Sequence, residues 1–132
     1  METTTATALV VDDNYFNRDL FKLALEHVGY TVLEAENGLI ALNLLKDHTF
    51  DLLVVDLAMP ELDGASLIRR IRKEEQHEHM IIVVVTANHH LATHNVDLDA
   101  DYFMYKPIDI AEFAPFTQRL MNYKNNQKNQ TD

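Results

Sequence analysis

Residues Phe50 to Gly64 read FDLLVVDLAMPELDG, and this stretch is the first indication of the fold. Four apolar residues, Leu52 to Val55, run directly into the carboxylate of Asp56, and a turn containing Met-Pro follows. A short, continuous apolar run bounded by turn residues is typical of a strand buried in a parallel sheet. A carboxylate at the end of such a strand is unfavourable without a compensating partner, so Asp56 is a candidate functional residue.

The rest of the chain alternates strand-like runs with helical patterns. Five strands are expected, at residues 8–11, 31–35, 52–55, 80–85 and 101–106. Apolar residues at helical spacing predict helices within residues 14–29, 37–45, 64–75 and 109–123. A further helix is expected within residues 88–100, where the apolar residues are Leu91, Val96 and Leu98. This alternation predicts an α/β fold in which right-handed crossovers place helices on both faces of a parallel sheet.

The composition is that of one globular domain with an acidic surface. The 132 residues carry a formal net charge of -10 and no cysteine. This charge argues against direct nucleic-acid binding, which needs clustered Lys and Arg, and the lack of cysteine excludes disulfides and thiolate sites. The longest apolar run, Met80 to Val85, is too short to span a bilayer, and the first residues lack the features of a secretory signal. We therefore expect a cytoplasmic protein without membrane insertion.

Three segments are expected along the chain: a flexible N-terminus at residues 1–7, one domain at residues 8–123, and a polar tail or linker at residues 124–132. The final KNNQKNQTD has no pattern of apolar residues that could be buried, which is typical of a disordered segment. Two readings stay open, a protein that acts by itself and a piece of a larger protein in which this segment begins a linker.

Reactive side chains stand at the carboxyl ends of four expected strands: Asp12, Asp13, Asp56, Thr86 and Lys106. Ligands of open α/β sheets bind at those ends. Three carboxylates repel one another unless a cation lies between them, and oxygen donors favour Mg²⁺. A lysine and a hydroxyl nearby suit a transferring phosphoryl group, with Asp56 as the nucleophile that forms an aspartyl phosphate. Each residue alone could equally be a turn or capping residue, whereas the joint pattern is improbable by chance.

The same residues lie in four motifs, LVVDDN at 9–14, VVDLAMPELDG at 54–64, VVTA at 84–87 and YKP at 105–107. With these motifs in this order, the chain resembles the receiver domain of two-component response regulators over Ala8 to Tyr123. The segment DDNYFNRDLF also resembles receivers attached to hybrid histidine kinases. The resemblance implies a chemotaxis-regulator-like, flavodoxin-like fold, doubly wound, with strand order 2-1-3-4-5 and five helices.

The resemblance implies that Asp56 accepts a phosphoryl group from the phosphohistidine of a sensor histidine kinase or phosphotransfer protein. Mg²⁺ would be held by Asp13 and Asp56 through their side chains, by Ala58 through its carbonyl, and by Asp12 largely through water. Such a domain would catalyse its own phosphorylation and dephosphorylation but would turn over no separate substrate. It is therefore expected to be a signalling phosphoprotein and not an enzyme in the usual sense.

A switch is implied as well. Lys106 would pair with the phosphoryl oxygens, and its bond to Pro107 is expected to be cis. Thr86 would hydrogen-bond the phosphoryl group, and Phe103, the switch aromatic, would move inward with it. The surface formed by the fourth helix, the fifth strand and the last helix would then change. The downstream protein target is unknown, and a homodimer is left open.

Two features depart from the family pattern. No glycine precedes the fifth strand, in LDADYFMYKPI, and Pro115 falls within the last helical pattern. Asp109 as N-cap, with Glu112 three residues on, starts that helix early, so Pro115 is expected to kink or restart it. Both changes lie on the implied output surface, so no standard dimer or partner geometry is carried over. Ala58 and Asn88 occupy positions that tune phosphoryl lifetime in the family.

Three alternative functions were weighed. A protein-interaction module that works without phosphorylation would usually have lost a reactive residue, and all five are present. A phosphatase of the haloacid dehalogenase type needs a D-x-D nucleophile strand, which the spacing does not provide. A flavodoxin-like cofactor site would need a Ser, Thr or Gly-rich phosphate cradle in place of DDNYFNRD.

The histidines cluster in two polar stretches, His77 and His79 in the first, and His89, His90 and His94 in the second. In these stretches HEH and HH lack the i, i+4 spacing that presents a helical metal-binding pair. They are therefore interpreted as exposed residues of loops and helices.

Overall fold

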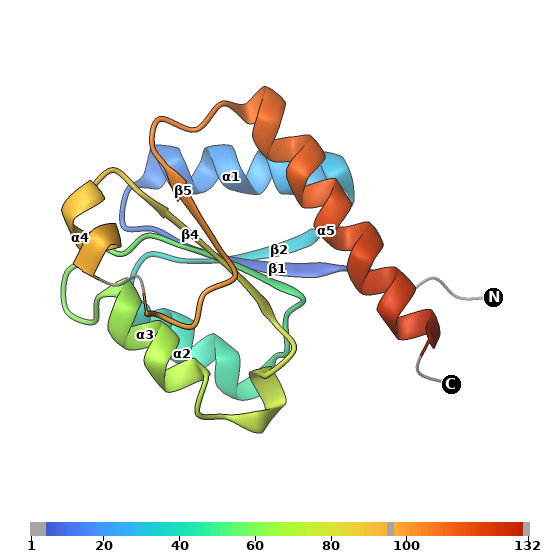
Figure 1. Ribbon diagram of the computed structural model, residues 1–132, viewed down its shortest axis with the longest axis horizontal. Coiled ribbons are helices and arrows are strands. Elements are labelled where there is room, and N and C mark those ends of the chain that lie inside the picture. The colour runs from blue at the N-terminus through green and yellow to red at the C-terminus, as the bar shows by residue number, and fades with distance from the viewer. Residues whose placement is uncertain (1–4, 95–96, 131–132) are drawn as a thin grey trace.

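The computed structural model describes residues 5–94 and 97–130 (Figure 1). In chain order, the elements are β1 (Thr7–Val11), α1 (Tyr15–Val28), β2 (Thr31–Ala35), α2 (Gly38–Asp47), β3 (Leu52–Val55), α3 (Gly64–Ile71), the 3-10 turn η1 (Glu75–His77), β4 (Ile81–Thr86), α4 (His89–His94), β5 (Tyr102–Tyr105) and α5 (Ile110–Gln130). The strands form one parallel sheet in the order β2-β1-β3-β4-β5. The predicted fold class and the implied strand order are confirmed.

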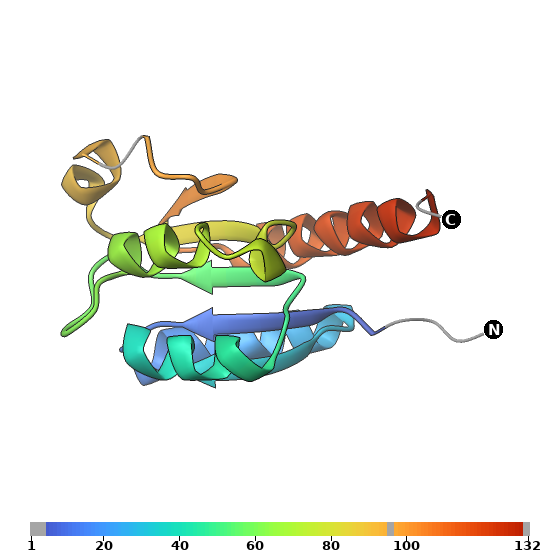
Figure 2. The same cartoon turned by 90° about the horizontal axis from the view of Figure 1, so that it is seen from below.

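The sheet is covered on both faces (Figures 1 and 2). One apolar cluster joins the sheet to α1 and α5 through residues such as Phe21 and Phe113. The other joins the opposite face to α2 and α3 through residues such as Leu45 and Ile68. Every residue of β3 and β4 is buried, which explains why these strands are continuously apolar in sequence. The edge strand β2 instead contains exposed and half-buried positions beside two buried ones.

Capping residues fix the helix ends. The side chain of Asn14 accepts a hydrogen bond from the backbone N–H of Asn17 at the start of α1. Gly29 ends the same helix with φ +123°, a conformation that favours glycine. Asp109 begins α5 by accepting from the backbone N–H of Ala111.

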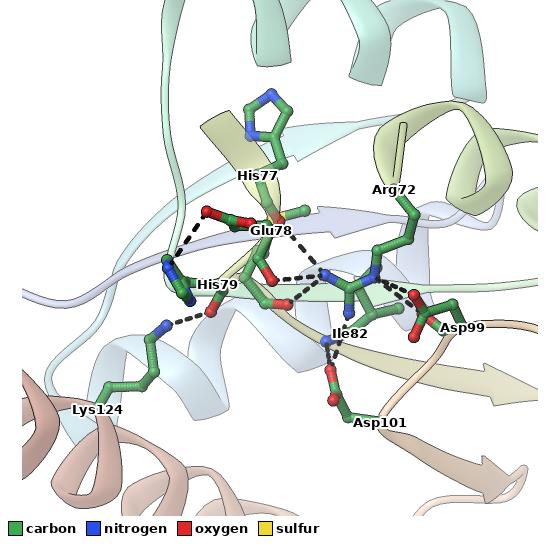
Figure 3. A network of polar contacts seen from close by, with 9 residues as sticks. Arg72, His77, Glu78, His79, Ile82, Asp99, Asp101 and Lys124 are labelled. Carbon is green, nitrogen blue, oxygen red and sulfur yellow. Dashed lines mark hydrogen bonds and ion pairs between the residues drawn. The ribbon is translucent and has the colours of Figure 1, made fainter. Parts of the chain in front are cut away.

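The C-terminal helix differs from expectation. α5 is one element that passes through Pro115 and continues to Gln130, so residues 124–130 of the expected tail are helical. No proline or glycine interrupts the sequence after Pro115, and Lys124 donates a hydrogen bond to the backbone oxygen of His79, which ties the extension to the segment after η1 (Figure 3). At the N-terminal end, Ala6 is buried and β1 begins at Thr7, so these two residues of the expected flexible segment 1–7 are part of the folded domain.

The short helix α4 falls within the segment expected to contain it. It spans only His89–His94, and Val96, one of its expected apolar residues, lies outside the described residues. In the described part of the chain, no helix is both long enough and apolar enough to cross a membrane.

Arg72 connects the end of α3 to the segments that flank β4 and β5 (Figure 3). Its guanidinium donates to the backbone oxygens of Met80 and Asp99, each at 2.9 Å. It also pairs with the carboxylate of Asp101 at 3.1 Å, and this carboxylate accepts from the backbone N–H of Ile82 at 2.7 Å. The Arg72 side chain is accordingly only 12% exposed.

Candidate functional site

The predicted site residues meet at the carboxyl edge of the sheet because the strand ladders continue past the strand ends. The backbone N–H of Asp56 donates to the oxygen of Val11 at 3.0 Å. In the same way, the N–H of Lys106 donates to the oxygen of Thr86 at 3.0 Å. Residues from four distant segments are thus fixed on one rim by backbone pairing alone.

Lys106 bridges two buried carboxylates. Its Nζ lies 2.9 Å from Oδ2 of Asp12 and 2.9 Å from Oδ2 of Asp56. Asp12 is 2% exposed and Asp56 is 7% exposed, whereas Asp13 lies at the surface. One oxygen of each of these three aspartates lies within 4.8 Å of the others. The structure therefore brings together the three predicted carboxylates and the predicted lysine.

Backbone groups hold the other oxygen of each buried carboxylate. Oδ1 of Asp12 accepts from the N–H of Asn14 at 2.9 Å, and Oδ1 of Asp56 accepts from the N–H of Ala58 at 3.0 Å. Both aspartates are therefore fixed in orientation by the loop that follows their own strand. This contact places Ala58 beside Asp56, and its carbonyl remains a predicted metal ligand.

Burial and pairing act in opposite directions on the ionisable groups. Burial is the largest influence on the pKa of Asp12 and raises it above its usual value, although the hydrogen bond from Lys106 lowers it. Burial is the largest single influence on the pKa of Lys106 and would lower it, but the hydrogen bonds to Asp12 and Asp56, together with the charges of these carboxylates, raise it overall. The two carboxylates therefore keep Lys106 charged, while burial disfavours the charged form of Asp12.

Three oxygen donors with this excess of negative charge suit a small, hard cation. Mg²⁺ is commonly held by one or two carboxylates together with water molecules. Asp12, Asp13 and Asp56 fit that donor set.

Thr86 is fully buried at the end of β4, and its Oγ1 accepts from the N–H of Asn88 at 3.1 Å. Phe103 is half-buried in β5 and pairs in register with Val84. Because side chains alternate along a strand, Thr86 and Phe103 project from the same face of the sheet. The predicted cis bond between Lys106 and Pro107 is present.

Arg18 belongs to the site but was not singled out from the sequence. Its Nη1 donates to the backbone oxygen of Asp12 at 2.8 Å, and its Nε pairs with Glu34 at 3.3 Å. A basic residue in the first turn of α1 carries no sequence signal that distinguishes this role from an ordinary surface position.

Gly64 is a second residue that the sequence analysis did not assign to the site. A Cβ atom at this position would lie 2.2 Å from the backbone oxygen of Asp56 and 2.8 Å from Cα of Leu57. The chain can approach the loop that follows Asp56 this closely only without a side chain, and the Gly64 N–H donates to the oxygen of Leu57 at 3.1 Å.

Gly64→Ala is expected to lower the free energy of unfolding by about 1–3 kcal/mol, because backbone atoms must shift to admit the methyl group. Urea denaturation measures this change. Ser66→Ala, in the same turn of α3, is the matched control and should stay within about 0.5 kcal/mol of the parent. Equal stability of the two variants would contradict the close approach.

The interpretation of the histidines needs two corrections. His77 is buried, 1% exposed, with its Nε2 3.0 Å from the backbone oxygen of Leu45, because η1 packs against the end of α2. His90 and His94 do have i, i+4 spacing, and their ring centroids lie 4.1 Å apart on α4. The i, i+4 spacing runs across Leu91 to Thr93 and is not contained in HH or HEH.

The chain was compared with known protein families. Residues 8–116 match the family described as response regulator receiver domain. The chain belongs to this family. Receiver domains are signalling switches of two-component systems and are phosphorylated by histidine kinases or phosphotransfer proteins; they bind Mg²⁺ at an acidic aspartate cluster.

Individual relatives agree with this assignment. The polar-differentiation response regulator DivK of Brucella ovis is 32% identical over 83 residues, which are 63% of this chain and 68% of that protein. A receiver domain of a Pseudomonas aeruginosa sensor histidine kinase, solved with a magnesium ion in its active site cleft, has 26% identity and a TM-score of 0.80. That alignment covers 90% of this chain and 99% of the other chain. The chemotaxis protein CheY4 of Vibrio cholerae, at 24% identity and a TM-score of 0.80 over 89% of this chain and 99% of that chain, shares the fold.

Proposed function

We propose that this receiver domain is a phosphorylatable switch that accepts a phosphoryl group on Asp56 in a Mg²⁺-dependent reaction. The donor would be a phosphohistidine of a sensor histidine kinase or phosphotransfer protein in the cytoplasm. The observation that supports this most directly is the single Lys106 ammonium 2.9 Å from both Asp12 and Asp56, with Asp13 in the same cluster. We take residues 8–123 as the working unit, with the remainder of α5 as an extension.

Side chains and backbone groups of this domain would supply the nucleophile and position it for phosphoryl transfer. An oxygen of the Asp56 carboxylate attacks phosphorus as the phosphorus–nitrogen bond of the donor breaks, and the donor nitrogen keeps the bonding electrons. The Ala58 N–H holds Asp56 in place, and Lys106 turns its hydrogens toward the incoming phosphoryl oxygens. When bound by Asp12, Asp13, Asp56 and the Ala58 carbonyl, Mg²⁺ supplies positive charge that offsets the charge of the phosphoryl group. Hydrolysis of the aspartyl phosphate in the same site would reset the domain.

The response of the surface would begin at Thr86. Its hydroxyl hydrogen can be donated to a phosphoryl oxygen on Asp56, and such a movement would disturb the contact with the N–H of Asn88. Space vacated next to β5 would allow the half-buried Phe103 to turn inward. We propose that the surface of α4, β5 and α5 changes in this way and is read by a protein partner, or by a second copy of the domain.

The test is incubation with acetyl phosphate, with and without Mg²⁺, followed by intact-protein mass spectrometry. The proposal requires a mass increase of one phosphoryl group that depends on Mg²⁺. If the folded protein gains no such group, the alternative, an interaction module that works without phosphorylation, is favoured.

Metal binding gives a separate prediction. Mg²⁺ at ten times its dissociation constant should stabilise the folded protein by about 1.4 kcal/mol, because the ion binds only the folded site. Thermal denaturation across a Mg²⁺ titration measures this as a rising Tm. Asp13→Asn removes one exposed charge of the cluster and should remove most of the rise. The same rise in both proteins would contradict the metal site.

A further inference from the structure

A pair of histidines lies on α4, away from the acidic cluster. His90 and His94 are one helical turn apart and both are exposed. Their ring centroids lie 4.1 Å apart, with the rings at 77° to each other. α4 lies at the end of the molecule toward which the strands point (Figures 1 and 2).

We propose that His90 and His94 bind a divalent transition-metal ion of the zinc class. Neutral imidazole is a good ligand for Zn²⁺, Cu²⁺ and Ni²⁺ but not for Mg²⁺. Residues four apart on a helix share one face. At a Zn–N distance of ~2.05 Å, two nitrogens on a tetrahedral ion lie ~3.3 Å apart. Rings whose centroids are already 4.1 Å apart reach this arrangement by rotating exposed side chains, without movement of the backbone.

The neighbouring histidine is arranged differently. The ring of His89 stacks on Tyr105 of β5, with centroids 4.3 Å apart and the rings within 5° of parallel. His89 therefore packs against β5 and does not join His90 and His94. The site therefore has two protein ligands, and water would complete the coordination of the ion.

Metal binding here would act on a helix that is too short to be stable by itself. A helix of six residues is well below the length that persists in isolation, so a link between its first and second turns should hold it in helical form. The helix is coupled to the rim of the sheet through Asn88. The backbone N–H of Asn88 donates to Oγ1 of Thr86, and the Asn88 side chain accepts from the N–H of Leu91 at 3.0 Å. An effect of the bound ion on the switch at Thr86 rests on the proposed function, whereas the binding of the ion does not.

The test is a calorimetric Zn²⁺ titration of protein without a histidine tag, in excess Mg²⁺ so that the acidic cluster is saturated. We expect one equivalent to bind and the ring resonances of His90 and His94 to shift together in NMR spectra. His90→Ala and His94→Ala should each weaken binding by at least about tenfold, since each removes half of the protein ligands. Circular dichroism confirms that the variants are folded.

Two controls separate this site from other histidines. His79→Ala removes an imidazole that is 89% exposed, and His89→Ala removes the neighbour stacked on Tyr105; both should leave the Zn²⁺ affinity unchanged. Affinity that survives in the His90→Ala/His94→Ala double variant, or that falls equally with His79→Ala, would overturn the proposal. Asp56→Asn should bind Zn²⁺ like the parent, so a failure of the phosphorylation proposal stays distinguishable from a failure of this one.

Discussion

Asp56→Asn is expected to abolish phosphorylation by acetyl phosphate, with a fall in rate of more than about 10³-fold. The amide oxygen keeps the shape of the side chain and can still accept from the N–H of Ala58, so the loop should stay in place. What is lost is the negative charge that makes the carboxylate a nucleophile. Intact-protein mass spectrometry in saturating Mg²⁺ measures the remaining phosphorylation.

Glu61→Gln is the matched control for this variant. It removes the same charge from an exposed residue in the loop that follows Asp56 and should be phosphorylated at the parent rate. A phosphoryl group that still forms on the Asp56→Asn protein, with the same dependence on Mg²⁺, would place the acceptor on another residue. Loss of phosphorylation in both variants would mean that the net charge of the loop, and not the nucleophile, is limiting.

Lys106→Met is expected to lower the free energy of unfolding by about 3 kcal/mol in the absence of Mg²⁺. The variant leaves the buried carboxylates of Asp12 and Asp56 facing each other without their common cation, and removing one partner of a buried ion pair costs roughly this much. For a domain of this size, the change corresponds to a fall in Tm of about 10 °C. Urea denaturation in EDTA measures the free energy directly.

Mg²⁺ should restore part of the stability lost in Lys106→Met, because the ion supplies positive charge to the same carboxylates. Lys46→Met makes the same chemical change at an exposed position on α2 and should cost less than about 0.5 kcal/mol. If both variants lose the same stability, the bridge between Asp12 and Asp56 contributes nothing. If Mg²⁺ stabilises Lys106→Met no more than the parent, the ion and the lysine do not act on a shared charge.

The predicted side chains lie close together because backbone topology alone brings their strand ends to one rim. Once the strands are parallel and in the order β2-β1-β3-β4-β5, the residues after Val11, Val55 and Val85 must meet at one rim. No side-chain packing has to be known for that result. The roles of Asp56, Thr86 and Lys106 in phosphoryl transfer, and those of Ala58 and Phe103, stay predictions.

The features that the sequence did not predict depend on contacts between distant segments or on how much room a side chain has in the folded protein. The burial of His77 arises from η1 packing near Leu45, thirty-two residues earlier in the chain. The need for glycine at position 64 arises from the nearby Asp56 backbone, and the continuation of α5 is accompanied by a contact between Lys124 and His79. The i, i+4 spacing of His90 and His94 was visible in the sequence, but it has meaning only once α4 is known to span both residues.

The network around Arg72 has a consequence for the mobility of β5. The strand is anchored at its start, where Asp101 is held by Arg72 and by the N–H of Ile82, and at its end, where Lys106 is held by two carboxylates. A strand anchored at both ends cannot slide or detach as a unit while those contacts persist. Signals crossing this edge of the sheet should therefore travel as rotations of individual side chains along a stationary backbone. Backbone amide exchange in β5 should then stay slow while its aromatic rings change environment.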